Sequence, residues 1–312
     1  MQITEVSPKE YDSFFTQYPH TYNSVDFNML NKHKAEELHF LVFADQKVRL
    51  GIILGERADR RMYSPFSAPF GGFTTNKPQH FDITDNAVSL LKDYAERQNR
   101  SIVITLPPPF YDDRQLALAT NALHRRARTR FIDVNYHFDI ADFANYNAMI
   151  ERNARNKLNQ AMRQNLDFVH VKSTDTENVR RAYAVIKANR EERGYPLRMS
   201  LEEVMETTKI IPADFFLLTQ GDNDIAAAQV FHVRGDICQV IYWGDKREFS
   251  ALRPMNYFAY CIFKHYHEQG IKILDIGPST EDGAPNYGLC DFKQGIGCKS
   301  TLKFSFELNA HD

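Results

Sequence analysis

The feature that most constrains the fold of this chain is an order of elements that occurs twice. Segments 38–66 and 214–245 each contain three short apolar runs separated by polar or charged turns. Such runs predict three strands joined by tight turns, an antiparallel meander. Each meander is followed by a segment with apolar residues at helical spacing, 82–99 or 254–270, and then by another apolar run, 101–106 or 272–277. Sequence identity between the halves is negligible, so the shared order β-β-β-α-β is what indicates a duplicated α/β unit.

Helices are expected between the two repeats. Segments 149–165 and 176–194 carry apolar residues at helical spacing, and Gly194 is a typical helix stop. Ser200 stands three residues before Glu203, which is the spacing of a capping box at the start of a third helix. With no low-complexity segment between the halves, we expect two closely packed domains, residues 1–145 and 146–312.

Composition limits the class of protein. Of the 312 residues, 43% are hydrophobic and 25% are charged, as in ordinary globular proteins. The net charge of -2 argues against a general nucleic-acid coat protein. No apolar run reaches the roughly 18 residues of a membrane span. The N-terminus lacks a signal-peptide pattern, and the four cysteines form no C-x-x-C pair, so we expect reduced thiols and a cytoplasmic location.

The stretch CDFKQGIGCKS, 290–300, places a lysine beside two glycines. A phosphate-binding P-loop requires G-x-x-x-x-G-K-[ST], which Cys298 interrupts here, and a helix should follow it rather than a strand. Cys290 and Cys298 are too far apart for a paired metal knuckle, and no histidine joins them. The stretch therefore predicts a glycine-containing turn that carries Lys293 before a final strand, 301–308, either as a solvated lysine or as a functional one.

Two other places combine a predicted strand end with polar or aromatic side chains. Tyr242 and Trp243 fall near the end of the run 238–245 and indicate either core packing or an apolar slot for an acyl group, next to strand N–H groups that can bind a carbonyl. Asp275 ends a run just before Gly277-Pro278, where a carboxylate contacts substrate or is simply capped or paired.

Basic residues gather in HRRARTR, 124–130, and on the helix 149–165, which carries Arg152 and Arg155. Both groups are either solvated helix faces or contacts for a phosphate-bearing partner. His265 and His267 are two residues apart on a predicted helix, so they point to different faces and cannot chelate one ion together.

The C-terminal half resembles the Fem-type aminoacyl transferases and related two-lobed acyltransferases of the GNAT superfamily. The similarity rests on the closing segment Phe292-Lys293-Gln294-Gly295-Ile296-Gly297, preceded by Tyr287-Gly288-Leu289. The helix RNARNKLNQAMRQN, the stretch ANREERGYPLRMS and the turn SAPFGGF, 67–73, are similar to further segments of that family. The resemblance implies an α/β fold of two tandem GNAT-like lobes, each with a mixed, mainly antiparallel sheet flanked by helices, of which the first is degenerate.

The resemblance also implies an activity: transfer of an acyl or aminoacyl group from an activated ester or thioester to an amine on a cell-envelope precursor or amino sugar. Lys293 would stabilise the oxyanion, and Tyr242 and Asp275 would position substrate or move a proton. The implied substrate-binding residues are Phe292, Trp243, Arg152, Arg155, Arg190 and Tyr287. The implied donor is acyl-coenzyme A or an aminoacyl-tRNA, the implied acceptor is a small or nucleotide-linked amine, and no metal is implied.

Two alternatives remain open from the residues. The region from Gly244 to Gly270 has no glycine in between and lacks the GNAT pyrophosphate loop, which favours a donor such as aminoacyl-tRNA over a small-molecule N-acetyltransferase using acetyl-coenzyme A. A non-catalytic double lobe that binds a nucleotide-linked ligand or a protein is the other alternative. A catalytic protein is expected to expose Lys293, Tyr242 and Asp275 in an open cleft, whereas a degenerate one would bury Lys293 in structural contacts.

Overall fold

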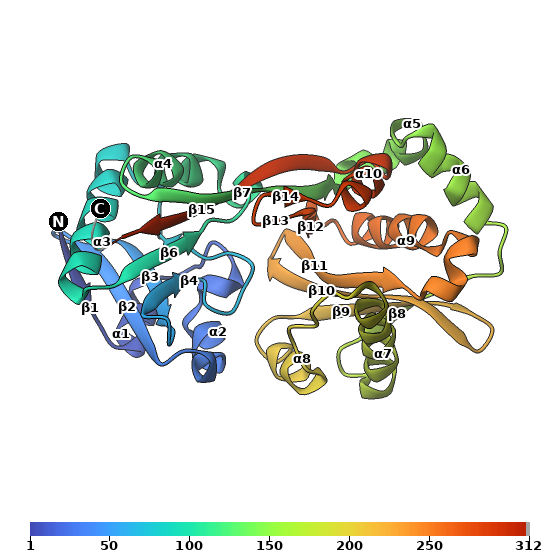
Figure 1. The fold of residues 1–312 in the computed structure, drawn as a ribbon, viewed down its shortest axis with the longest axis horizontal. Coiled ribbons are helices and arrows are strands. Elements are labelled where there is room, and N and C mark those ends of the chain that lie inside the picture. The colour runs from blue at the N-terminus through green and yellow to red at the C-terminus, as the bar shows by residue number, and fades with distance from the viewer. Residues whose placement is uncertain (310–312) are drawn as a thin grey trace. The chain divides into compact units, whose positions relative to one another are not determined.

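The computed structural model describes residues 1–309, which form two compact units (Figure 1). Of these residues, the first unit contains Met1–Val134, Thr280–Ala284 and 301–309; the second contains Asn135–Ser279 and Pro285–Ser300. The first unit therefore ends its first segment at Val134 and includes two short C-terminal segments, and the division into domains 1–145 and 146–312 stays a prediction. Within residues 1–309, no helix combines the length and apolar character needed to cross a membrane.

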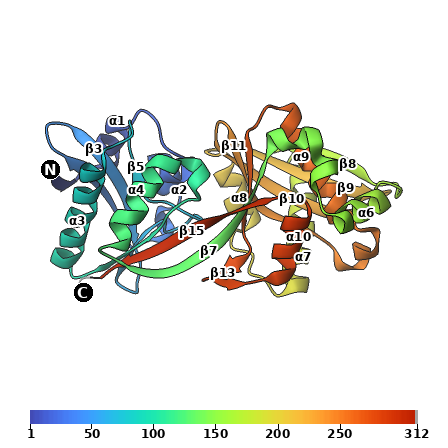
Figure 2. The same cartoon turned by 90° about the horizontal axis from the view of Figure 1, so that it is seen from above.

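Strands and helices of the first unit follow the predicted order. Its strands are β1 (Gln2–Glu5), β2 (Glu37–Ala44), β3 (Val48–Glu56), β4 (Arg61–Ser64), β5 (Phe73–Thr74) and β6 (Ser101–Thr105). Its helices are α1 (Pro8–Phe14), α2 (Val25–Leu30), α3 (Phe81–Gln98) and α4 (Asp113–His124), with 3-10 turns η1 (Thr21–Asn23), η2 (Lys32–Lys34) and η3 (Pro109–Tyr111). Two long strands, β7 (Arg128–Asp139) and β15 (Lys299–Leu308), run from one unit into the other (Figure 2).

Alternation along β2 explains why helices cover both faces of the first sheet, whose strand order is β1-β2-β3-β4-β6-β15. Successive side chains of a strand point to opposite faces. Leu41 and Phe43 join a core made with α3 and α4, whereas Phe40 and Val42 join a second core made with α1 and α2.

The second unit repeats this architecture. Its strands are β8 (Asp167–Lys172), β9 (Ala213–Gln220), β10 (Asn223–Arg234), β11 (Ile237–Asp245) and β12 (Ile273–Pro278). Its helices are α5 (Tyr146–Met149), α6 (Arg152–Ala161), α7 (Thr176–Arg193), α8 (Leu201–Thr207), α9 (Pro254–Glu268) and α10 (Tyr287–Gly295), with 3-10 turns η4 (Ile140–Asn145) and η5 (Arg247–Leu252). The short strands β13 (Thr280–Glu281) and β14 (Ala284–Pro285) pair with each other. The strand order is β7-β12-β11-β10-β9-β8, and α9 covers one face of the sheet while α7 and α8 cover the other (Figure 1).

The predicted duplication is confirmed. Strands β2, β3 and β4 form an antiparallel meander, and α3 returns the chain to β6, which pairs parallel with β4. Likewise β9, β10 and β11 form an antiparallel meander, and α9 leads to β12, which pairs parallel with β11. The predicted capping box is also present: the Ser200 side chain accepts from the Glu203 N–H, and the Glu203 carboxylate accepts from the Ser200 N–H.

The closing segment differs from the sequence prediction. Lys293 lies in the last turn of helix α10 and not in a glycine-containing turn; the turn comes later, at Gly297 with φ +88°. The two glycines within α10 are poor helix formers, which hides the helix from sequence reasoning. The side chain of Asn286 accepts from the Leu289 N–H and so starts the helix.

Gly194 ends α7 in a way that controls the next residues. Its φ of +68° lies in the left-handed region, its N–H donates to the carbonyl of Glu191, and the N–H of Tyr195 donates to the carbonyl of Arg190. These two bonds define a Schellman motif. The motif turns the chain back, so the Tyr195 ring faces the Arg190 guanidinium at 5.7 Å.

We predict that Gly194→Ala lowers the free energy of unfolding by about 1 kcal/mol, because an L-residue is strained at this φ. A Cβ at Gly194 would meet nothing within 4 Å, so the cost comes from the backbone alone. Gly235→Ala is the matched control: a Cβ there also meets nothing within 4 Å, and its φ lies outside the left-handed region. Urea denaturation measures both variants, and equal effects would contradict the role of Gly194.

Candidate active site

Strands β11 and β12 separate soon after they meet. Three register pairs join them, Ile237–Gln239 with Ile273–Asp275. β11 continues to Asp245 with β10 on its other side, but no further pair joins it to β12. Within residues 1–309, the β12-facing edge of β11 beyond Gln239 therefore has no strand partner. Main-chain N–H groups on such an edge can bind a carbonyl or a developing oxyanion.

Asp275 is fully buried at the point of separation. Its carboxylate accepts from the side-chain amides of Asn135 at 2.8 Å and Gln239 at 2.7 Å, and from the N–H of Gly277 at 2.9 Å. β12 does not end at Asp275 as predicted but continues to Pro278 after a bulge between Asp275 and Gly277. The carboxylate thus joins the bulge to both neighbouring strands, since each of these buried donors gives it a hydrogen bond.

Lys293 is buried under the same strand end, with 3% of its surface exposed. Its ammonium donates to the carbonyls of Ile276 at 3.0 Å, Gly277 at 2.9 Å and Pro278 at 3.0 Å, and it lies 5.5 Å from the centre of the Tyr136 ring. An ammonium has three N–H donors, so these three carbonyls use all of them. In this geometry Lys293 holds the end of β12 and offers no donor to a substrate, and its predicted role at an oxyanion stays a prediction.

Arg190, by contrast, has a half-buried guanidinium between two aromatic rings. It lies 4.9 Å from the centre of the Tyr242 ring and 5.7 Å from that of Tyr195. Burial lowers the pKa of Arg190 below its usual range, and the nearby Arg198 lowers it further. Among residues 1–309, no carboxylate pairs with either arginine. Stacking on rings stabilises a guanidinium yet leaves its in-plane N–H donors available for an anion.

The residues around Arg190 hold one another in place. The Tyr242 hydroxyl accepts from the N–H of Arg198 at 3.1 Å, and the Tyr195 hydroxyl accepts from the Asn286 side chain at 2.8 Å. A tyrosine hydroxyl that accepts one bond can still donate its own proton. We name Arg190, Tyr195, Arg198, Tyr242 and Asn286 the arginine–tyrosine cluster; it joins the ends of α7 and β11 to the start of α10.

Two aromatic residues connect this cluster to Lys293. Trp243 follows Tyr242 on β11 and is half-buried, and its ring meets that of Phe292 edge-on at 5.9 Å. Phe292 precedes Lys293 on α10. Tyr287, the first residue of α10, is 74% exposed. Trp243 and Phe292 thus meet between β11 and α10, and the roles of these two residues, Tyr242 and Tyr287 in binding substrate stay predictions.

The other arginines noted in the sequence either lie away from Arg190 or already have partners within the protein. Arg155 on α6 donates to the carbonyls of Ile150 at 3.1 Å and Ala148 at 3.5 Å, whereas Arg152 is exposed. No observed contact joins either of them to Arg190 in the described chain. The arginines of segment 124–130 are bound by carboxylates, with Arg125 and Arg126 on Asp85 and with Arg128 and Arg130 on Glu307. Ion pairs account for that cluster without a phosphate-bearing partner.

Sequence reasoning named Arg190 and Tyr242 but not Tyr195, Arg198 and Asn286. Tyr195 and Arg198 lie in the quoted stretch ANREERGYPLRMS, just after the helix stop at Gly194. A Schellman turn returns the following residues toward the last helical turn, so the glycine was the available signal. Asn286 is 91 residues from Tyr195, and no local pattern predicts that contact.

The connection between β11 and α9 stands where GNAT proteins would have the glycine-rich pyrophosphate loop that this sequence lacks. It forms the 3-10 turn η5, and Arg253, which precedes α9, takes a left-handed φ of +58°. The N–H of Arg247 donates to Glu192, and the Ala251 carbonyl accepts from Gln160. A turn already bound to side chains, one of them acidic, is a poor cradle for a pyrophosphate, which needs unpaired N–H groups.

A hollow of about 530 Å³ lies away from these residues. It is lined by η4, the end of α9 and the start of β12, including Asp139, Asp142, His267 and Lys272. None of the predicted site residues lines it.

Comparison with known proteins identifies the fold. The sequence matches no protein-family model and no curated protein. The structure is similar to that of FemX, with a TM-score of 0.71 and 14% identity over 99% of this chain and 97% of FemX. It is also similar to L-PGS from Bacillus licheniformis, with a TM-score of 0.62 and 11% identity over 99% and 93% of the two chains. A tandem GNAT protein from the clavulanic acid biosynthesis pathway gives 0.53 and 10% over 88% and 84%.

These matches confirm the predicted fold class and the resemblance. The chain has the Fem/GNAT-like double acyltransferase fold, with mixed and mainly antiparallel pairing. The TM-scores show the fold, and at identities of 10 to 14% they show nothing about the substrate.

We predict that Asp275→Ala lowers the free energy of unfolding by about 3 kcal/mol or more, because it removes a charged acceptor from three buried donors. Asp222→Ala is the control, since Asp222 is an exposed carboxylate in the turn between β9 and β10. Urea denaturation followed by circular dichroism measures both. A loss below about 1 kcal/mol for Asp275→Ala would show that its hydrogen bonds do not hold the bulge.

Proposed function

We propose that this protein is an N-acyltransferase that modifies the amino group of a phosphate-bearing acceptor. The acceptor would be either a nucleotide-linked amino sugar or a cell-envelope precursor. The proposal rests on the surroundings of Arg190. Its half-buried guanidinium lies over the rings of Tyr195 and Tyr242, and it pairs with no carboxylate in residues 1–309. Burying an unpaired charge lowers the stability of the protein unless a ligand supplies the opposite charge. Phosphate oxygens match the planar N–H donors of a guanidinium.

The other members of the cluster extend the same anion site. Arg198 brings a second guanidinium, and the hydroxyls of Tyr195 and Tyr242 each retain a proton to donate. The start of α10 lies at the cluster through Asn286, and a helix N-terminus favours negative charge. Tyr287, which is exposed and follows Asn286, would contact the acceptor beside the cluster. Arg152 and Arg155 would serve a more distant phosphate, at the far end of α10 from Asn286.

The acyl group of the donor would lie along the unpaired edge of β11, against Trp243 and Phe292. The acceptor amine attacks the donor carbonyl, a C–N bond forms, the C–O or C–S bond breaks, and the amine proton goes to the leaving oxygen or sulfur. Main-chain N–H groups of β11 would stabilise the oxyanion, and holding the two reactants together would supply much of the rate. Tyr242 would position the reactants, and Lys293 and Asp275 would act as positioning residues by fixing the end of β12.

The donor we propose is an aminoacyl-tRNA rather than acyl-coenzyme A. The occupied turn η5 supports this choice, because it leaves no pyrophosphate loop before α9. An aminoacyl ester at the end of a tRNA places the reaction in the cytoplasm.

A second candidate function, a binding protein without catalysis, is favoured by a specific observation. Lys293, Tyr242 and Asp275 are 3%, 6% and 0% exposed, and their hydrogen bonds are made within the second unit. A double lobe that only binds nucleotide-linked amines would keep the arginine–tyrosine cluster without any transfer.

The two functions separate in one experiment. The purified protein is incubated with a uridine-diphosphate amino sugar bearing a primary amine and with aminoacyl-tRNA or acetyl-coenzyme A, and amide products are detected by mass spectrometry. Product with aminoacyl-tRNA supports the proposal, and product with acetyl-coenzyme A alone rejects the proposed donor. Thermal stabilisation by the nucleotide without product from any donor would support the binding protein instead.

We predict that Arg190→Met weakens binding of the nucleotide about 10- to 100-fold, because a charge-assisted hydrogen bond contributes about 1.5–3 kcal/mol. The same change should alter the free energy of unfolding by only about 1 kcal/mol or less, since removing an unpaired, half-buried charge offsets the lost ring stacking. Calorimetric titration and urea denaturation measure the two effects.

Arg180→Met is the matched control, because Arg180 is an exposed arginine on the same helix, α7. It should leave binding unchanged. Wild-type affinity in Arg190→Met, or a loss of stability of about 3 kcal/mol, would show instead that Arg190 is a structural residue.

A further inference from the structure

Three histidines surround one aspartate at the far edge of the second sheet, and the proposed function uses none of them. His170 Nε2 lies 2.6 Å from one oxygen of Asp214, and His232 Nε2 lies 2.6 Å from the other. The Tyr266 hydroxyl donates to the same carboxylate at 3.0 Å. The ring of His265 is centred 4.5 Å from that of His170.

Strand register explains how residues so far apart in sequence meet. On β9, Asp214 pairs with Lys172 of β8 and with Val230 of β10. His170 and His232 are each two residues from those partners, so they share the face of Asp214 and are its diagonal neighbours. Helix α9 covers this face and supplies His265, whose ring packs on Phe216 at 5.0 Å. The sheet and the helix therefore assemble the group without any local sequence motif.

The donor atoms are close enough for one metal ion. One ligand atom each from His170, Asp214 and His265 lie within 4.8 Å of one another. A tetrahedral zinc ion with bonds of about 2.1 Å places its ligand atoms about 3.4 Å apart, so side-chain shifts of about 1 Å close the site. Two imidazoles and one carboxylate are a donor set that zinc accepts, and 29% exposure of the His170 side chain gives an ion access.

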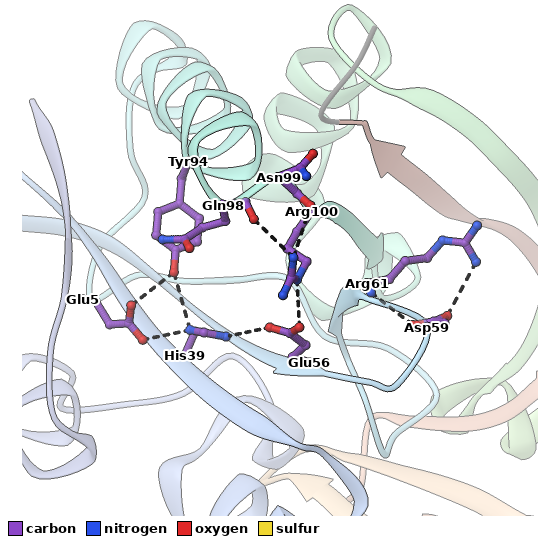
Figure 3. A network of polar contacts seen from close by, with 9 residues as sticks. All are labelled: Glu5, His39, Glu56, Asp59, Arg61, Tyr94, Gln98, Asn99 and Arg100. Carbon is purple, nitrogen blue, oxygen red and sulfur yellow. Dashed lines mark hydrogen bonds and ion pairs between the residues drawn. The ribbon is translucent and has the colours of Figure 1, made fainter.

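A second histidine lies among carboxylates in the first unit, but one of those carboxylates already has an arginine partner. His39 lies between Glu5 and Glu56 in the first unit, at 2.9 and 3.7 Å (Figure 3). There Arg100 binds the Glu56 carboxylate at 2.8 Å and already neutralises it (Figure 3). No lysine or arginine pairs with Asp214 anywhere in residues 1–309. On the sheet, the partners of Asp214 are the imidazoles of His170 and His232, a side chain that binds a metal through an unprotonated ring nitrogen.

We propose that His170, Asp214 and His265 bind a divalent transition metal ion of the zinc class, with a water as the fourth ligand. His232 holds the second oxygen of Asp214 and orients the carboxylate, as partners of metal ligands commonly do. The ion would tie helix α9 to β8, the last strand of the sheet, and thereby brace the second unit. The site is independent of the arginine–tyrosine cluster.

The experiment titrates chelator-treated full-length protein with Zn²⁺ by calorimetry and with Co²⁺ by visible absorption. The proposal predicts one equivalent of zinc, a higher melting temperature, and the intense absorption bands of four-coordinate cobalt. His265→Ala and His170→Ala should each weaken zinc binding about 10- to 100-fold or more. Circular dichroism checks that each variant is folded.

His124→Ala and Cys290→Ser are the controls. His124 is exposed on α4, and Cys290 is a partly exposed free thiol, a side chain that can hold zinc outside the proposed site. Both should bind zinc as the wild type does. Failure of the wild-type protein to bind zinc would overturn the proposal, as would equal zinc affinity in wild type, His170→Ala and His265→Ala.

Discussion

Strands β11 and β12 separate after three residue pairs, and the candidate site of the second unit is built beside that separation. The β11–β12 ladder ends at Asp275, whose carboxylate accepts from both neighbouring strands and from the bulged Gly277 N–H. At the bulge, three successive carbonyls accept hydrogen bonds from the ammonium of Lys293 on α10. One buried carboxylate and one buried ammonium, each fully hydrogen-bonded, thus keep an open strand edge beside a helix start.

The arginine–tyrosine cluster is built on that arrangement but follows a different physical logic. Asp275 and Lys293 are satisfied within the protein, so their burial is explained without a ligand. Arg190 is half-buried, repelled by Arg198 and held only by ring faces. A protein tolerates such an incomplete site when the missing partner is its ligand, which is why Arg190 and not Lys293 carries the proposed function.

How much of this was predictable depends on how local each interaction is. The meanders, the returning helices and the capping box at Ser200 follow from patterns within a few residues, and the sequence predicted them. Helix α10 was missed because its two glycines conceal it, and the zinc-class group was missed because His170, Asp214 and His265 come together through strand register. For the same reason Lys293 could be noticed in the sequence, but its three carbonyl acceptors on β12 could not.

The most direct measurement is a crystal structure of the protein grown with a uridine-diphosphate amino sugar. We expect a phosphate oxygen within hydrogen-bond distance of the Arg190 guanidinium, which still lies over the rings of Tyr195 and Tyr242. An ordered nucleotide bound elsewhere, with Arg190 paired to a carboxylate of the protein, would rule out Arg190 as the phosphate-binding residue.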